Sequence, residues 1–438
     1  MIDPSITRAR RQAILQQLQG MPLLFRAAPE VLRNGDVHYS YRQDSNFHYM
    51  TGFDEPEAIL LAVPHGKGRH DTILFVRPRD PAREIWDGKR AGATGARRRY
   101  GADEAYDIDE FWKVFGDMSK DWDGLAHGLG IDTAFDARLL QHFGRRFKDR
   151  PRRNRGLPAF VDPRPDIHAR RLIKGPEEIE LMAEAARITG EGHRVAMALA
   201  RPGMMEYELQ AELEAVFRKN GSPRVGYDSI VAAGANACTL HYVENDKKIR
   251  KGDLVLIDAG AEYGHYSADV TRTFPAGGSF NDPQRAIYNI VLRCQKKCIK
   301  AIKPGLPVSK LMEMSQKEIL KGLDKLGLLG RGSLENKWKN RAFAKYYMHG
   351  LGHWLGMDVH DCGAYQLPDG KPVRLAPGMV TTVEPGIYIP ANDKTVPKEF
   401  RGIGVRIEDD ILVTRNGHRN LTEDIPKEIA DIESLTLG

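Results

Sequence analysis

The sequence has few cysteines, no long apolar run and little net charge. Its four cysteines include no CxxC pair, and four in 438 residues do not make a disulfide framework. No apolar stretch approaches the ~20 residues that a membrane span requires. The first twenty residues lack the apolar core and cleavage site of a signal peptide and favour an amphipathic helix. These absences argue against a disulfide-stapled secreted protein and a membrane partner, and they favour the reducing cytoplasm.

The charge balance argues against another class of partner. A net charge of +6 is small for this length, whereas nucleic-acid binders usually carry a much stronger basic bias, so we expect no nucleic-acid partner. The hydrophobic fraction of 41% and the charged fraction of 28% are typical of globular proteins. At ~100–200 residues per domain, the length predicts two or three domains.

Several hydrolase and nucleotide-binding signatures are also missing. The sequence contains no HExxH helix, no GxSxG elbow and no P-loop. Gly350, Gly352 and Gly356 only partly resemble a dinucleotide loop, because their spacing departs from GxGxxG.

The first ~160 residues alternate short apolar runs, such as Ala58–Val63 and Thr72–Val76, with helical patterns, as α/β domains do. From Arg145 to Pro165 the composition shifts to arginine and proline, which predicts a surface loop leading to a domain junction near Asp166–Ile173. A partner-binding patch is the alternative interpretation of this basic run.

The remaining sequence predicts an α+β domain. Pro176, three glutamates and the stop at Pro202–Gly203 delimit one helix, and a second ends at Gly221. Helices interleaved with hairpin-like strands favour an antiparallel sheet over a parallel Rossmann-type sheet. The further predicted strands are Leu254–Ile257, Val270–Phe274, Val380–Val383 and Ile403–Val413, and the further helices are Arg285–Ile302 and Val308–Leu326.

Two aspartates flank a predicted hairpin. The run LVLIDAG contains Asp258, and after a turn around Gly264 the chain returns through ADVTRTFP, which carries Asp269. Carboxylates on neighbouring strands can point into one space. Taken alone, however, an aspartate at a strand end is usually a turn-former.

The segment HGLGHWLGMDVHD places His349, His353 and His360 within twelve residues, among glycines and apolar residues. Glycine-rich backbone beside histidine indicates close approach of a ligand. The alternative is three neutral core histidines satisfied by hydrogen bonds.

Two glutamates lie near the C-terminal strands. Glu384 follows the β-forming run VTTV and precedes a predicted Pro-Gly turn. In IGVRIEDD the apolar residues alternate with Gly404, Arg406 and Glu408, so Arg406 and Glu408 share one face. In isolation such a charged face, followed by two aspartates, is typical of the surface.

Together these acids favour metal binding. Burying acids beside β-rich runs is costly without a cation, and four crowded carboxylates would raise one another's pKa values. Two divalent cations balance four negative ligands, and a bridging water then loses a proton readily. Oxygen ligands with a single imidazole favour Mn²⁺ or Co²⁺ over tetrahedral Zn²⁺, which stays compatible.

These segments closely resemble the aminopeptidase P family, the Xaa-Pro aminopeptidases of the creatinase and methionine aminopeptidase superfamily. The resemblance covers nearly the whole chain. It rests on YRQDSNFHYMTGFDEPEA and EIWDGKR in the first part and on LHYVEND, LVLIDAG, ADVTRTFP, HGLGHWLGMDVHD, TVEPGIYI and RGIGVRIEDD in the second. It implies a pita-bread catalytic domain over residues 169–438, an antiparallel sheet with flanking helices. An α/β creatinase-type domain over residues 1–168 would precede it, shape the mouth of the site and build oligomer contacts.

The resemblance also implies the roles of individual residues. Asp258 would chelate one metal ion, His353 and Glu384 would bind the other, and Asp269 and Glu408 would bridge the pair. Glu384 would also shuttle a proton, and His360 would donate to the oxyanion. The residues near the substrate proline would be His241, His349, Arg406 and Tyr388.

The implied reaction removes the N-terminal residue from peptides with proline in second position, through attack of a metal-bridging hydroxide on the X–Pro carbonyl. Two divalent ions would be required, with Mn²⁺ preferred and Co²⁺ or Zn²⁺ as alternatives. The resemblance further implies a homodimer or homotetramer, in which Trp86 would reach a neighbouring subunit.

Two rival functions are compatible with this fold. A prolidase, which cleaves X–Pro dipeptides, has the same fold and all five ligands, so the ligands alone do not separate it from an aminopeptidase. A scaffold protein that kept the fold and lost its activity would be expected to have lost several ligands, whereas here every ligand position is filled.

Overall fold

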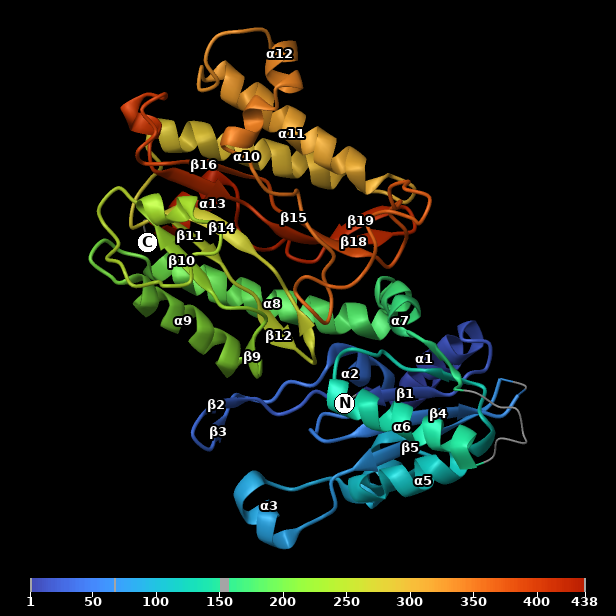
Figure 1. Ribbon diagram of the computed structural model, residues 1–438. Helices are drawn as coiled ribbons and strands as arrows, with labels where there is room; N and C mark the ends of the chain where they lie inside the picture. Colours follow the sequence, from blue (N-terminus) through green and yellow to red (C-terminus); the bar gives the residue numbers. More distant parts are fainter. Residues whose placement is uncertain (1, 67, 150–156, 437–438) are drawn as a thin grey trace. The chain divides into compact units, whose positions relative to one another are not determined.

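The computed structural model describes residues 2–66, 68–149 and 157–436 (Figure 1). The chain divides into two compact units, Met1–His168 and Ala169–Gly438. The division falls inside a helix, α7 (Arg164–Arg171), rather than inside a loop.

The first unit contains a six-stranded mixed sheet in the order β6-β5-β4-β1-β7-β8. Its central strands pair antiparallel and its outer strands pair parallel. The predicted apolar runs form β4 and β5, whose residues are mostly buried. The strands are β1 (Leu23–Arg26), β4 (Ile59–Pro64), β5 (His70–Val76), β6 (Glu104–Asp107), β7 (Gly124–Ala126) and β8 (Ala159–Val161), with a separate hairpin β2 (Leu32–Asn34) and β3 (Val37–His38).

The helices of this unit account for the other half of the predicted α/β pattern. The N-terminal helix begins where the side chain of Asp3 accepts a hydrogen bond from the amide of Ser5, and its proline lies in the first turn, where it breaks no helical hydrogen bond. The helices are α1 (Pro4–Gln17), α2 (Ser45–Thr51), α3 (Pro81–Asp87), α4 (Gly92–Tyr100), α5 (Phe111–Met118) and α6 (Thr133–Asp149), with 3₁₀ turns at Ile108–Glu110 and Ser119–Asp121.

The prediction of a surface loop over residues 145–165 is partly wrong. Residues 145–149 continue α6, and residues 159–161 form β8 at the edge of the sheet. The error arose because three residues of an edge strand carry too short a pattern to recognise among arginines and prolines. Residues 150–156 of this segment lie outside the described residues.

The second unit is built from antiparallel strand pairs wherever the structure describes it, as expected from the hairpin-like sequence pattern. Its strands form the groups β10-β11-β14, β13-β12-β9, β15-β18-β19 and β16-β17. They are β9 (Arg224–Val225), β10 (Ile230–Ala233), β11 (Leu254–Asp258), β12 (Ala261–Tyr263), β13 (Tyr266–Ser267), β14 (Thr271–Pro275), β15 (Val380–Val383), β16 (Gly386–Ile389), β17 (Ile403–Arg406), β18 (Asp409–Thr414) and β19 (Gly417–Asn420).

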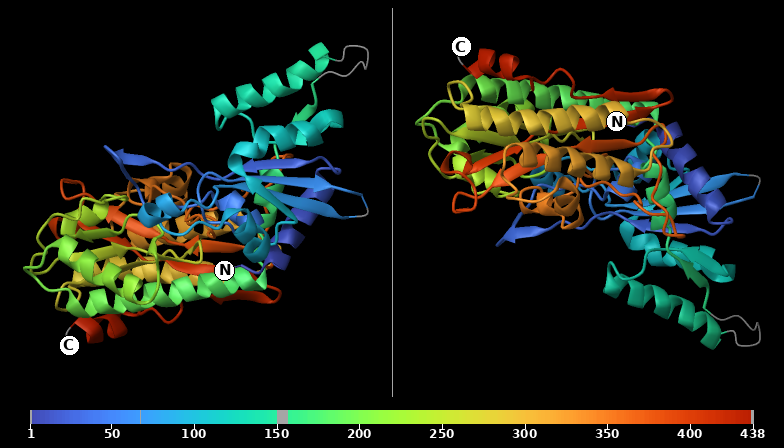
Figure 2. Two further views of the ribbon diagram at one scale, coloured as in Figure 1. Left: turned by 90° about the horizontal axis from the view of Figure 1, so that it is seen from below. Right: turned by 90° about the horizontal axis from the view of Figure 1, so that it is seen from above.

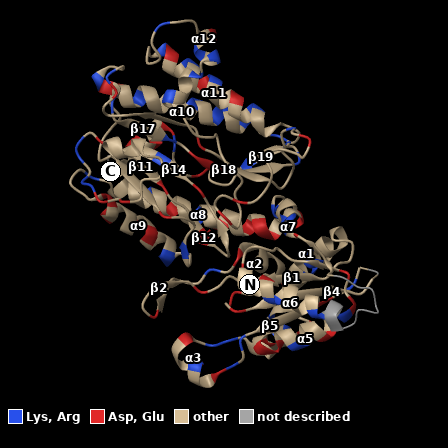
Figure 3. Cartoon of the chain, viewed as in Figure 1, with Lys and Arg blue, Asp and Glu red and all other residues tan. Residues whose placement is uncertain are grey.

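Long helices cover these strands on two sides, with α8 and α9 on one side and α10 and α11 on the other (Figures 1 and 2). Basic and acidic positions are interspersed along these helices, and acidic positions also occur among the enclosed strands (Figure 3). The helices are α8 (Pro176–Leu199), α9 (Glu206–Lys219), α10 (Asp282–Ala301), α11 (Val308–Lys325), α12 (Leu334–Lys339) and α13 (Ile429–Thr436), with 3₁₀ turns at Gly234–Cys238, Ala342–Lys345 and Lys398–Phe400.

The single strand predicted over Ile403–Val413 is in fact two strands in different groups. β17 pairs with β16, whereas β18 pairs with β15 and β19. Glu408 lies in the break, where its amide donates to the Thr271 carbonyl at 3.1 Å. Both faces of this segment are buried, so the charged face is not at the surface. The Pro-Gly turn expected after Glu384 is instead the start of β16.

Gly260 allows the segments that carry the two aspartates to approach closely. The chain runs from β11 through β12 and β13 to β14, and the amide of Ala268 donates to the Ala261 carbonyl at 3.1 Å. A Cβ atom on Gly260 would lie 1.8 Å from the Ala268 carbonyl oxygen. Only glycine fits at this crossing.

In the described residues, no helix is both long enough and apolar enough to span a bilayer.

We expect Gly260→Ala to lower the free energy of unfolding by about 3 kcal/mol, because the added methyl group forces the two strands apart. Denaturant unfolding of the purified variant measures this. Gly278→Ala is the matched control, since beyond its two chain neighbours no described heavy atom lies within 4 Å of the added Cβ atom. The control should change stability by less than about 0.5 kcal/mol, and equal stability of the two variants would contradict the close approach.

Candidate metal centre

A cavity of about 470 Å³ gathers the predicted site residues of the second unit except Tyr388. Three distant stretches of sequence line it, at residues 227–269, 349–360 and 384–408. The predicted site residues on its wall are Asp258, Asp269, His353, Glu384, Glu408, His241, His349, His360 and Arg406.

The two aspartates meet at one tyrosine. Asp258 is the last residue of β11, and the amide of Asp269 donates to Asp410 Oδ2 at 3.1 Å. The Tyr227 hydroxyl lies within hydrogen-bonding distance of Oδ1 of both Asp258 and Asp269. Its single proton serves one acceptor at a time, so the second aspartate oxygen needs another source of positive charge.

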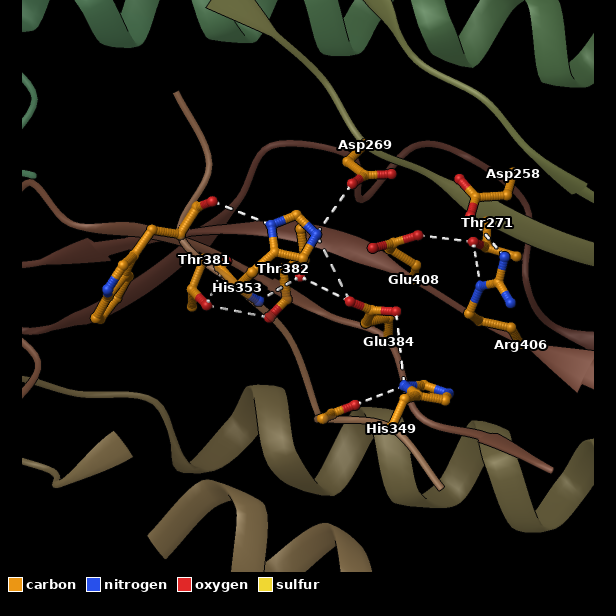
Figure 4. Close-up of polar contacts among 12 residues, drawn as sticks. Asp258, Asp269, Thr271, His349, His353, Thr381, Thr382, Glu384, Arg406 and Glu408 are labelled. Atoms are coloured by element: carbon orange, nitrogen blue, oxygen red, sulfur yellow. Dashed lines mark hydrogen bonds and ion pairs between the residues drawn. The ribbon is translucent and has the colours of Figure 1, made fainter. Parts of the chain in front are cut away.

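His353 is held by backbone contacts that fix its ring. Its amide donates to Thr382 Oγ1 at 3.0 Å, and its carbonyl accepts from the Thr382 amide at 2.9 Å. A Cβ atom on the preceding Gly352 would lie 2.1 Å from the Thr382 carbonyl oxygen, so only glycine permits this approach. The ring Nδ1 donates to the Trp354 carbonyl at 3.0 Å, which leaves Nε2 facing the acids (Figure 4).

That Nε2 atom lies between two carboxylates. It is 3.2 Å from Asp269 Oδ2 and 3.6 Å from Glu384 Oε1. Glu384 follows β15, and its amide donates to the Leu351 carbonyl at 2.8 Å. Glu408 enters from the break between β17 and β18 and accepts from Thr271 Oγ1 at 2.6 Å.

The carboxylates strongly perturb one another. Burial raises the pKa of Asp269, and the nearby charge of Asp258 raises it further. Burial and neighbouring carboxylates raise the pKa of Glu384 to about 7 and hold the pKa of Glu408 well above its usual range. Burial alone would lower the pKa of His353, but contact with Asp269 raises it to about 9.

This donor set fits divalent metal ions. Ligand atoms of Asp269, His353 and Glu408 all lie within 4.8 Å of one another, and only 5% of Asp269 and 1% of Glu408 is exposed. Crowded, buried oxygen donors with one oriented imidazole nitrogen form a ligand set typical of Mn²⁺, Co²⁺ or Zn²⁺. A cation would also remove the repulsion that raises the carboxylate pKa values.

Arg406 connects the ligand carboxylates with a second group of predicted residues. It is fully buried and donates from Nη2 to Asp258 Oδ2 at 2.6 Å and from Nε to Thr271 Oγ1 at 3.0 Å. Its Nη1 donates to the Tyr388 hydroxyl at 3.1 Å. The same hydroxyl lies 2.8 Å from His349 Nε2. Tyr388 therefore lies behind the cavity wall and orients two residues that line it.

The histidines on the wall differ in environment. Burial, and then the charge of Arg406, lowers the pKa of His349 to about 4, so this histidine is neutral at pH 7. His360 is exposed in the cavity, and its ring meets that of His353 at 80° with 4.3 Å between centroids. Burial, followed by the charge of His353, lowers the pKa of His360. His241 is also exposed on the wall.

Sequence reasoning missed the roles of Tyr227 and Thr271, whose hydroxyls contact the carboxylates, and of Asp410, which accepts from the Asp269 amide. Tyr227 lies in an irregular stretch with no periodic pattern, and Thr271 resembles any other β-former in a strand. Trp86 belongs to α3 in the first unit and is 84% exposed.

Family comparisons match both parts of the chain. Residues 180–415 match metallopeptidase family M24, and residues 7–125 match the N-terminal domain of aminopeptidase P. The chain is 42% identical over 431 residues to the Xaa-Pro aminopeptidase of Escherichia coli (strain K12), covering 98% of this chain and 97% of that protein.

Solved structures agree over the same length. The chain is similar to aminopeptidase PepP of Pseudomonas aeruginosa, with a TM-score of 0.95 and 45% identity over 99% of this chain and 98% of that one. It is also similar to zinc-substituted Escherichia coli aminopeptidase P in complex with product, with a TM-score of 0.95 and 40% identity over 100% of this chain and 98% of that one.

We expect a chelator to lower the unfolding temperature and Mn²⁺ to restore it, because a cation that binds only the folded chain stabilises it. Ligand at a hundredfold excess over Kd contributes about 2.7 kcal/mol. Thermal unfolding with and without Mn²⁺, alongside elemental analysis of bound metal, measures this.

The variant Asp269→Asn tests the ligand set. Its amide keeps the size of the side chain and can still contact Tyr227 and His353, so we expect it to fold, but Mn²⁺ should raise its unfolding temperature far less. Asp393→Asn is the matched control, because Asp393 pairs with Lys345 at 2.8 Å and does not line the cavity. An undiminished Mn²⁺ response in Asp269→Asn would contradict the proposed centre.

Proposed function

The chain belongs to metallopeptidase family M24 and removes the N-terminal residue from peptides that have proline in second position. We propose that five side chains hold two divalent metal ions for this reaction. The five are Asp258, Asp269, His353, Glu384 and Glu408. The observation that carries this proposal is the convergence of Asp269, His353 and Glu408 within 4.8 Å in a chain that matches Xaa-Pro aminopeptidases over nearly its whole length.

We assign Asp258 to one ion, His353 and Glu384 to the other, and Asp269 and Glu408 to both. The position of Asp269 supports this division. On one side Asp269 shares the Tyr227 hydroxyl with Asp258, and on the other side it contacts His353 Nε2. The Asp258 oxygens accept from Tyr227 and Arg406, and each carboxylate oxygen keeps a further lone pair for a cation.

Mn²⁺ is the ion we expect first, with Co²⁺ or Zn²⁺ as alternatives, because oxygen ligands dominate the set. When bound, such ions lower the pKa of water and polarise a carbonyl group. Glu384 then accepts the proton of the attacking water and delivers it to the proline nitrogen. It reaches both sides of the site, with Oε1 3.6 Å from His353 Nε2 and Oε2 3.9 Å from His349 Nδ1.

His360 donates a hydrogen bond to the oxyanion that forms when water adds to the X–Pro carbonyl. It is suited to this role because it is exposed in the cavity directly beside His353. His241, His349 and Arg406 form the wall against which the proline ring docks. Tyr388 keeps His349 and Arg406 in place through its hydroxyl.

The first unit has a separate role in this proposal. We assign residues 1–168 to the mouth of the site and to contacts in a homodimer or homotetramer. Ile85 and Trp86 on α3 are 81% and 84% exposed, and adjacent exposed apolar side chains are suited to a protein contact. The four free cysteines suit a cytoplasmic location.

A peptide panel tests the reaction. The Mn²⁺-loaded protein should release arginine from Arg-Pro-Pro and should leave Arg-Ala-Pro intact, since the pocket selects proline after the cleaved bond. Chromatography of the products measures both. Efficient cleavage of Gly-Pro with no cleavage of Arg-Pro-Pro would identify a prolidase instead, and a metal-free, inactive protein would support the scaffold function.

His360→Ala tests the oxyanion contact separately. We expect kcat for Arg-Pro-Pro to fall by about 10²–10³, the usual cost of removing one such donor, with unchanged metal content. His418→Ala is the matched control, because His418 contacts the Ile302 carbonyl at 3.0 Å and lies outside the cavity. A variant of His360 that loses its metal would show that His360 has a different role.

A further inference from the structure

The segment between His353 and His360 lacks regular structure. Apart from one bridge between Trp354 and Thr381, residues 354–361 form bends rather than a helix or strand. Such a segment has no hydrogen-bond ladder of its own to fix its path. Backbone hydrogen bonds of Leu355, Gly356 and Asp361 fix parts of its path. The position of His360, near its end, also depends on contacts made by neighbouring side chains.

Buried ion pairs supply these contacts. Asp361, directly after His360, accepts from Arg171 Nη2 at 2.6 Å and from Lys174 Nζ at 2.9 Å, and each of the three side chains is at most 3% exposed. Arg171 also reaches Asp358 Oδ2 at 2.8 Å. We call Arg171, Lys174 and Asp361 the Asp361 clamp.

Backbone contacts on two sides hold the residues of the clamp in place. The Lys174 amide donates to the Gly378 carbonyl at 2.8 Å, next to the strand that leads to Glu384. A Cβ atom on Gly356 would lie 2.2 Å from Asp361 Oδ2 and 2.9 Å from Lys174 Cε, so only glycine leaves room for this pair.

The clamp also shares an acceptor with the metal centre. The Trp354 carbonyl accepts from the Asp361 amide at 2.9 Å and from His353 Nδ1 at 3.0 Å. One carbonyl therefore orients the ring of a metal ligand and, at the same time, anchors the residue that follows His360.

We propose that the Asp361 clamp is a positioning device that holds His360 at the distance from the metal ligands at which it meets the oxyanion. This inference rests on the role proposed above for His360. Arg171 and Lys174 do not line the cavity, so in this proposal they act through the loop. Because misplacing a catalytic group by ~1 Å can cost a hundredfold in rate, a side chain on an irregular loop needs such a brace.

Charge is essential to the clamp. Arg171 and Lys174 face Asp361 and Asp358, two cations against two anions, and all except Asp358 are buried. Removing one cation leaves buried negative charge without full compensation, so the Asp361 carboxylate would move toward water and displace His360 with it.

We expect Lys174→Met to lower kcat for Arg-Pro-Pro by about 10–100-fold, the range typical when a residue that orients a ligand is lost, with KM and metal content unchanged. Steady-state kinetics and elemental analysis of the Mn²⁺-loaded protein measure this. Lys174→Arg keeps the cation and should recover most of the rate. If Lys174→Met does not fold, Asp358→Asn, whose side chain is 42% exposed, should give a smaller loss of kcat in the same direction.

The decisive comparison introduces Lys174→Met into the His360→Ala variant. If the clamp acts through His360, the second substitution should then lower kcat less than twofold, whereas its effect on the unfolding temperature should persist. Lys337→Met is the matched control, since Lys337 is 8% exposed and donates to the Gly330 carbonyl at 2.7 Å, outside the cavity. It should reduce stability and leave kcat unchanged.

The outcomes separate this inference from the proposed function. An equal loss of kcat from Lys174→Met with and without His360, or loss of metal from Lys174→Met, would overturn the clamp. A His360→Ala variant with normal kcat would instead overturn the role of His360 itself.

Discussion

Four carboxylates share one cavity wall in the catalytic unit, and their mutual repulsion is the constraint on which the rest of the site depends. Three of them, Asp269, Glu384 and Glu408, have raised pKa values because burial and neighbouring charges oppose ionisation. Hydroxyl donors from Tyr227 and Thr271 and the guanidinium of Arg406 offset only part of this repulsion. A pair of divalent cations would compensate the remainder, so metal binding and the stability of the folded unit are coupled.

Holding the acids together also requires a rigid frame behind them. Arg272 is completely buried and donates to the carbonyls of Thr271, Glu408, Ile425 and Pro426 and to the carboxylate of Asp409. It ties the strand after Asp269 to the break that carries Glu408. Because four of these five partners are main-chain oxygens, the position of the proposed metal ligands follows from the backbone rather than from the flexibility of each side chain.

The sequence predicted the strands and acids of the site better than their surroundings. LVLI and VTTV are β-forming runs that are each followed directly by an acid, and both lie in strands whose last residue is a proposed ligand or immediately precedes one. Family resemblance was needed to choose His353 among three histidines, since all three line the same cavity. The role of Tyr227 could not be predicted, because it depends on contacts with Asp258 and Asp269, which lie 31 and 42 positions later in the sequence.

The run Glu408-Asp409-Asp410 shows why residue type alone does not assign a role. Burial would raise the pKa of Asp409, but Arg272 and Lys427 lower it to about 2, so this carboxylate is a permanent anion in an ion-pair network. Burial and the charge of Asp269 hold the pKa of Asp410 well above its usual range, and this side chain accepts from the Asp269 amide. Three adjacent acids thus face the proposed metal site, an arginine and a backbone amide. What distinguishes them is the group that the fold places opposite each. The Thr271 hydroxyl, the Arg272 guanidinium and the Asp269 amide all come from residues more than 130 positions earlier.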